Sequence, residues 1–179
     1  MKTTQILIAG FGGQGILFSG KFLAYKGLME DYQVSWLPSY GPEMRGGTAN
    51  CNVIISESPV GSPIITTPDV LIAMNTPSLQ KYVDTVVSGG QIYVDSSLID
   101  VKVERKDVEA FYIPATQMAK DAGITTLANM IIVGHLLENH PELSFDGTAD
   151  VVEKLVPPKK AALKELNIKA LNMGKDYKN

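Results

Sequence analysis

Short apolar runs alternate with longer stretches in which apolar residues recur at helical spacing. The apolar runs predict strands at residues 5–9, 34–37, 49–55, 69–75, 91–95 and 109–113. The longer stretches predict helices at residues 16–29, 77–87, 115–122, 127–138, 146–155 and 159–171. This alternation is typical of an α/β fold, so we expect a three-layer sandwich with a largely parallel, Rossmann-like sheet and helices on both faces.

Several local features refine this expectation. We expect short additional strands at 64–65 and 101–106, and a polar tail that frays from residue 173. Thr76 is our candidate N-cap for the helix that begins with Pro77. Asn129 is a polar residue on an otherwise apolar helix, which predicts a buried hydrogen bond or a contact with a neighbouring element. With no linker or repeat, we expect one domain over residues 1–179.

A glycine-rich turn follows the first predicted strand directly. Gly10, Gly12 and Gly15 satisfy the spacing G-x-G-x-x-G, and Gly13 and Gln14 lie between them, just before the first helix. Glycines allow a tight turn, and the following helix presents free N–H groups that favour an anion. The turn is therefore a candidate phosphate site, although doubly wound domains also use such turns with nothing bound.

A dinucleotide such as NAD is a poorer candidate than another phosphate ligand. NAD-binding folds place an acidic residue at the end of the second strand, where it binds the ribose hydroxyls. Residues 33–39 contain no acid, and Glu30 and Asp31 precede that strand.

The second candidate segment is the loop at residues 39–48, which carries large side chains among glycine and proline. Arg45, followed by Gly46 and Gly47, could bind a phosphate or carboxylate. The other large or rigid residues of this loop suit an interface: Tyr40, Pro42, Glu43 and Met44. The alternative is a surface loop in which Arg45 pairs with Glu43.

Composition limits the possible partners and cofactors. A formal net charge of −3 gives no reason to expect nucleic acid, and no apolar run is long enough to cross a membrane. No signal peptide is visible, and the single cysteine fits the cytoplasm. One cysteine cannot hold a four-cysteine iron–sulfur cluster, and two histidines leave little for a metal site. We expect Cys51 to be a core residue.

Three motifs resemble those of a known family. They are G-F-G-G-Q-G-I-L-F-S-G-K at 10–21, W-L-P-S-Y-G-P-E-M-R-G-G-T-A-N at 36–50 and A-M-N-T-P-S at 73–78. Their order and content resemble the gamma subunit of 2-oxoacid:ferredoxin oxidoreductases, over essentially the whole chain. The second motif looks most like the branch that acts on 2-oxoglutarate or branched-chain 2-oxoacids. The indolepyruvate branch shares elements of it, so an aryl 2-oxoacid stays open.

The resemblance implies a reaction that this chain does not perform alone. Such enzymes decarboxylate a 2-oxoacid on thiamine diphosphate, pass electrons through [4Fe–4S] clusters to ferredoxin and transfer the acyl group to coenzyme A. Thiamine diphosphate and Mg²⁺ are expected on the alpha and beta subunits. The clusters are expected on those subunits or on a ferredoxin-like delta subunit. We expect no catalytic residue and no metal site on this chain.

Our hypothesis is that the chain helps to form the coenzyme A site and the subunit interface. The expected coenzyme A residues are Gly10, Gly12, Gly13, Gln14, Gly15, Arg45, Gly46, Gly47 and Asn75. The alternative is that the two glycine segments only pack against other subunits. Two rival classes stay open: a free-standing dinucleotide-binding oxidoreductase, and a non-catalytic nucleotide-binding assembly module.

Overall fold

The computed structural model describes residues 3–39 and 48–178. Its strands are β1 (Thr3–Phe11), β2 (Gln33–Ser39), β3 (Thr48–Ser56), β4 (Val70–Ala73), β5 (Gln91–Asp95) and β6 (Glu109–Ile113). Its α-helices are α1 (Ile16–Met29), α2 (Thr76–Tyr82), α3 (Ala115–Asp121), α4 (Ala128–Asn139), α5 (Thr148–Leu155) and α6 (Ala161–Asp176). Short 3₁₀ turns are η2 (Val83–Thr85), η3 (Thr125–Leu127) and η4 (Pro158–Lys160).

The described strands form a six-stranded sheet in the order β2-β3-β1-β4-β5-β6. β1, β4, β5 and β6 are successively parallel, whereas β3 is antiparallel to both of its neighbours. The connection from β2 to β3 spans residues 40–47, which is too short for a crossover helix, so the two strands pair antiparallel. The expected largely parallel sheet is confirmed.

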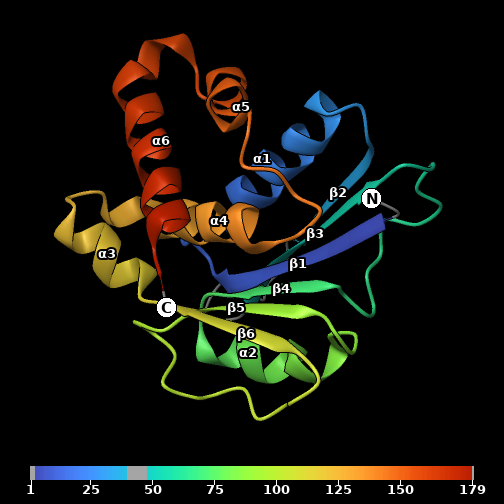
Figure 1. The fold of residues 1–179 in the computed structure, drawn as a ribbon. Helices are drawn as coiled ribbons and strands as arrows, with labels where there is room; N and C mark the ends of the chain where they lie inside the picture. The colour runs from blue at the N-terminus through green and yellow to red at the C-terminus, as the bar shows by residue number, and fades with distance from the viewer. Residues whose placement is uncertain (1–2, 40–47, 179) are drawn as a thin grey trace.

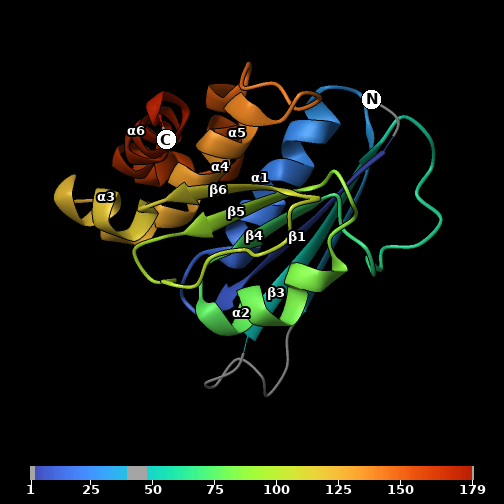
Figure 2. The ribbon, with the colours of Figure 1, turned by 60° about the horizontal axis from the view of Figure 1, so that its bottom comes forward.

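Helices cover both faces of the sheet, as expected, but unequally. α1, α3, α4, α5 and α6 lie on one face and α2 on the other (Figures 1 and 2). Alternation along the strands supplies both cores: Ile6 and Ile8 face the larger core, and Leu7 faces the smaller core beneath α2. The sheet is therefore buried on both sides, which explains the continuous apolar runs.

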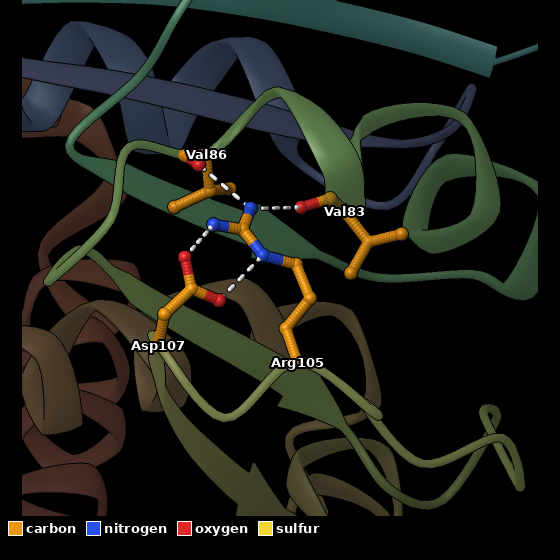
Figure 3. Close-up of polar contacts among 4 residues, drawn as sticks. All are labelled: Val83, Val86, Arg105 and Asp107. Carbon is orange, nitrogen blue, oxygen red and sulfur yellow. Dashed lines mark hydrogen bonds and ion pairs between the residues drawn. The ribbon is translucent and has the colours of Figure 1, made fainter.

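Two short strands expected from the sequence are wrong. Residues 64–65 and 101–106 are irregular. In residues 101–106, a side chain rather than a neighbouring strand accepts a backbone hydrogen bond. The Val103 N–H donates to the Tyr112 hydroxyl at 2.9 Å. Figure 3 shows Arg105 paired with Asp107 and donating to the carbonyls of Val83 and Val86, at 3.0 and 2.7 Å. These bonds fix the segment beside α2 and η2.

The expected helix end at residue 171 is also wrong, because residues 173–176, expected to belong to a fraying tail, continue α6 to Asp176. Gly174 lies against the backbone of α4, where a Cβ atom would collide with the Ile131 carbonyl. Gly134 of α4 meets the Leu171 backbone of α6 in the same way. These glycines let the two helices pack closely, and that packing holds the polar final turns of α6 in place.

Candidate functional site

The predicted site residues in the described chain gather at one edge of the sheet. β1, β4 and β5 are parallel, so their carboxyl ends share this edge. The glycine turn follows β1, and Asn75 follows β4 by two residues. Ser39 and Thr48, which end β2 and begin β3, lie at the same edge because β3 pairs antiparallel with both β1 and β2. Open α/β sheets bind ligands at such an edge.

The glycine turn is tight and leads directly into α1. The Gln14 N–H donates to the Phe11 carbonyl at 3.3 Å, which closes a turn over Gly12 and Gly13. Gly13 and Gly15 have φ angles of 89° and 75°, which favour glycine. Gly15 is the N-cap of α1 and makes no side-chain cap bond. The first N–H groups of the helix are therefore left without a side-chain acceptor at the N-cap.

Three main-chain donors of the turn have no partner within residues 3–39 and 48–178. No hydrogen bond engages the N–H groups of Gly12, Gly13 or Gly15 in that part of the chain. Gly12 and Gly13 are exposed, and Gly15 is half-buried. Free N–H groups before a fourteen-residue helix add to the positive end of its dipole, so the geometry suits an anion.

The Gln14 side chain is turned inward rather than toward a ligand. Its Oε1 accepts from the Phe11 N–H at 2.6 Å, and its Nε2 donates to the Met74 carbonyl at 2.9 Å. The amide thus joins the turn to the end of β4. Gly10 is packed against it, because a Cβ atom there would lie 2.6 Å from the Gln14 Oε1. Both residues shape the turn.

Asn75 lies at the same edge and caps α2. Its Oδ1 accepts from the Ser78 N–H at 2.8 Å, whereas its buried Nδ2 has no partner in the described chain. Asn75, not Thr76, is therefore the N-cap residue. The sequence favoured Thr76 because Pro77 follows it, but the helix begins at Thr76 and Pro77 occupies its first turn.

Two hollows flank the glycine turn. The first, of about 300 Å³, is mainly apolar and is lined by Phe11, Gly12, Gly13, Gly15, Ile16, Leu17, Phe18 and Ala49. The second, of about 180 Å³, is more polar and is lined by Gly13, Gln14, Met74, Leu98, Thr116, Thr125, Thr126 and Ala128. The sequence did not identify Phe11, Phe18 or the threonines as lining residues. Thr125 and Thr126 directly precede the helix predicted at residues 127–138, where such residues commonly act as caps.

Asp95, at the end of β5, was also not anticipated. Its carboxylate is fully buried and accepts from the N–H groups of Ser97 and Thr116, at 3.1 and 3.3 Å. The Thr116 hydroxyl donates to its other oxygen at 2.5 Å. These bonds hold the start of α3, so Asp95 positions one wall of the smaller hollow.

Cys51 is a core residue, as expected. It is fully buried, and this burial raises the pKa of its thiol to about 12, against the opposing effect of a hydrogen bond with Trp36. A thiol held protonated in this way is a poor nucleophile and a poor metal ligand. Within residues 3–39 and 48–178, no group of three or more His, Cys, Asp or Glu could hold a metal ion.

The expected loop residues Tyr40, Pro42, Glu43, Met44, Arg45, Gly46 and Gly47 lie outside the described residues. Of the helices that are described, none combines the length and the apolar character needed to cross a membrane.

Comparisons with known proteins match this architecture. The family described as pyruvate ferredoxin/flavodoxin oxidoreductase matches residues 5–177. The 2-oxoglutarate synthase subunit KorC of Methanothermobacter marburgensis is 35% identical over 96% of this chain and 95% of its own length. The ketoisovalerate oxidoreductase subunit VorA of the same organism is 36% identical over 98% of this chain. The chain spans only 37% of that longer relative.

Solved structures agree with the sequence relatives. The gamma subunit of a keto/oxoacid ferredoxin oxidoreductase from Geobacter sulfurreducens is similar with a TM-score of 0.81 and 29% identity, over 97% of this chain and 96% of that subunit. A 2-oxoglutarate:ferredoxin oxidoreductase from Magnetococcus marinus, solved with 2-oxoglutarate, coenzyme A and succinyl-CoA, gives a TM-score of 0.86 at 26% identity. The match covers 98% of this chain and 31% of that one. The chain therefore belongs to the pyruvate ferredoxin/flavodoxin oxidoreductase family and corresponds along its length to the gamma subunits of 2-oxoacid:ferredoxin oxidoreductases.

Proposed function

We propose that the chain acts as the gamma subunit of a multi-subunit enzyme that oxidatively decarboxylates a 2-oxoacid to its acyl-CoA and passes the electrons to ferredoxin. The nearly end-to-end match to KorC subunits supports this, and their name makes 2-oxoglutarate the first substrate to test. The VorA relatives make a branched-chain 2-oxoacid the second.

Within that enzyme, the glycine turn binds a phosphate group of coenzyme A. The observation that carries this proposal is the set of unpaired N–H groups on Gly12, Gly13 and Gly15 at the start of α1. Gly10 and Gln14 hold the turn, and Asn75 holds the adjacent end of β4 through its cap on α2. Arg45, Gly46 and Gly47 are proposed to add a cation and further N–H groups, and Tyr40, Pro42, Glu43 and Met44 to contact other subunits.

The redox and decarboxylation chemistry belongs to partner subunits. Thiamine diphosphate and Mg²⁺ are proposed on the alpha and beta subunits, and [4Fe–4S] clusters on those subunits or on a ferredoxin-like delta subunit. The residues of this chain do not fit a cluster, because its single cysteine is buried with a raised pKa. We assign this chain binding and positioning roles only.

A charge placed at Gly13 tests the anion site. Gly13 has open space around it and a positive φ that Asp and Asn tolerate better than other residues. In the purified complex, Gly13→Asp is expected to raise the KM for coenzyme A about tenfold or more through repulsion, and Gly13→Asn far less. The KM for the 2-oxoacid should not change.

Gly89 supplies the matched control for this test. Gly89 lies in the turn before β5 and has the same open surroundings and a φ of 81°. Unlike the Gly13 N–H, its N–H is already paired, because it donates to the Asp107 carbonyl. Gly89→Asp should leave coenzyme A kinetics unchanged. If Gly13→Asp and Gly13→Asn change the KM for coenzyme A equally, the turn does not bind an anion.

Anaerobic purification of the chain from its native cell tests the assembly. We expect thiamine diphosphate-containing, iron–sulfur subunits to co-elute, and turnover with 2-oxoglutarate to exceed that with ketoisovalerate, pyruvate or indolepyruvate. Elution of a colourless single chain that binds NADH tightly would favour the free-standing dinucleotide enzyme. A complex whose turnover does not depend on this chain would favour a non-catalytic assembly module.

A further inference from the structure

Asn129 reaches from α4 to the glycine turn. It is 3% exposed and lies in the first turn of a helix whose residues 128–137 are all buried. Its Nδ2 donates to the Gly15 carbonyl at 3.2 Å and to the Ser19 hydroxyl at 2.9 Å. The predicted buried contact of Asn129 is thus confirmed, and its partners belong to the start of α1.

The Asn129 side chain is not needed to pair a buried backbone group that would otherwise lack a hydrogen bond. The Gly15 carbonyl already accepts from the Ser19 N–H at 2.9 Å, so the Asn129 bond is a second one. In addition, the Asn129 Oδ1 is buried and has no partner in the described chain, which is unfavourable. An apolar residue of similar size would avoid that unpaired oxygen. The amide therefore links α4 to Gly15 and Ser19, and this link restrains the position of Gly15.

The contact leaves the turn little freedom. A Cβ atom on Gly15 would lie 2.5 Å from the Asn129 Nδ2, so Gly15 packs directly against the Asn129 amide. Because the peptide group is planar and trans, the N–H of Ile16 points away from the Gly15 carbonyl. A bond that draws this carbonyl toward α4 therefore directs the first N–H of α1 away from α4.

We propose that Asn129 is a positioning residue, which holds the free N–H groups of the glycine turn in the geometry that binds the phosphate of coenzyme A. This inference rests on the proposed function. Asn129 does not touch the ligand and acts through Gly15. Donors that are held before the ligand arrives lose less freedom on binding, so the restraint increases affinity.

Asn167 provides a matched control on α6. It is 1% exposed, its Nδ2 donates to the Leu163 carbonyl at 2.7 Å, and its Oδ1 also lacks a partner in the described chain. Unlike Asn129, it makes no hydrogen bond with the glycine turn, since its amide bonds within α6. Replacing either asparagine by leucine removes one buried amide, so the two variants differ mainly in what that amide holds.

The test compares Asn129→Leu and Asn167→Leu in the assembled complex, with coenzyme A affinity measured by calorimetry and by KM. Asn129→Leu should weaken coenzyme A about tenfold, the factor that corresponds to one hydrogen bond. Its kcat at saturating coenzyme A and its KM for the 2-oxoacid should stay unchanged. Asn167→Leu should bind coenzyme A like the wild type, whatever its thermal stability.

The outcomes separate this proposal from the proposed function. If Gly13→Asp weakens coenzyme A but Asn129→Leu matches Asn167→Leu, the positioning role is overturned and the anion site stands. If Gly13→Asp also has no effect, the anion site itself fails. Should Asn129→Leu not assemble, Asn129→Ser, whose side chain is too short to bridge to Gly15, replaces it with the same expected increase in KM. Wild-type affinity in that variant overturns the proposal.

Discussion

At the scale of single residues, polar side chains near the site mostly hold the backbone. Gln14 joins the turn to β4, Asn75 caps α2, Asp95 holds the start of α3 and Asn129 holds Gly15. The sequence predicted Gln14 and Asn75 as coenzyme A residues and Asn129 as a buried contact, but it could not give their partners within the fold. Asn129 and Gly15 are separated by 114 positions, and only the packing of α4 beside α1 brings them together.

His135 is a buried histidine whose protonation should oppose folding. It is 2% exposed, and its Nδ1 lies 3.0 Å from the Gly174 carbonyl. Burial lowers its pKa, with Lys178 acting in the same direction, and the Gly174 carbonyl and Glu138 oppose the shift. Burial likewise lowers the pKa of His140.

The depressed pKa values predict a loss of stability in mild acid. The unfolded chain takes up protons near pH 6.5, whereas the folded chain resists them, so stability is complete above that pH and falls below it. The slope is at most about 1.4 kcal/mol per pH unit for each histidine. Urea unfolding at pH 7.5 and pH 5.5 should show this, and His135→Leu should reduce the difference. An unchanged difference would exclude His135 as its source.

At the scale of elements, the best predicted features are those fixed by local pattern. The first helix and the strands at 91–95 and 109–113 have the expected bounds. The short strand expected at 101–106 is absent because hydrogen bonds of the Arg105 and Tyr112 side chains hold this segment, and no alternation of polarity reveals such bonds. The end of α6 was missed because residues 173–179 look like a polar tail, and only the structure shows Gly174 packed against the backbone of α4.

The close packing of α4 and α6 predicts a strong effect of any side chain at Gly174. Gly174→Val would drive its Cβ into the Ile131 carbonyl, so we expect a loss of about 3 kcal/mol in the free energy of unfolding. Gly61→Val is the control, because a Cβ atom there meets nothing within 4 Å. Chemical denaturation of both variants measures the difference. Equal stabilities would mean that the helices can separate at little cost.

At the scale of the molecule, the sheet separates a larger core from a smaller one. α1 and α3–α6 enclose the larger core, whereas α2 and partly buried residues of the 101–108 segment enclose the smaller one (Figure 1). The glycine turn lies between them, at the carboxyl edge of the sheet. The sequence predicted this location, because a strand, a glycine turn and a helix occur in order. It could not predict which face would carry the larger core, since that depends on the packing of α4 and α6.

The unequal cores predict unequal local stability, which hydrogen exchange measures residue by residue. Backbone amides of β1, β4 and α4 are buried in or beside the larger core, so they should exchange only on global unfolding. Amides of α2 and of residues 101–108 should exchange much faster, because a few side-chain bonds, chiefly those of Arg105, hold that layer. Arg105→Ala should accelerate exchange in α2 and residues 101–108 without changing β1 or α4. Acceleration throughout the sheet would mean instead that the two cores unfold as one unit, and that the glycine turn depends on both.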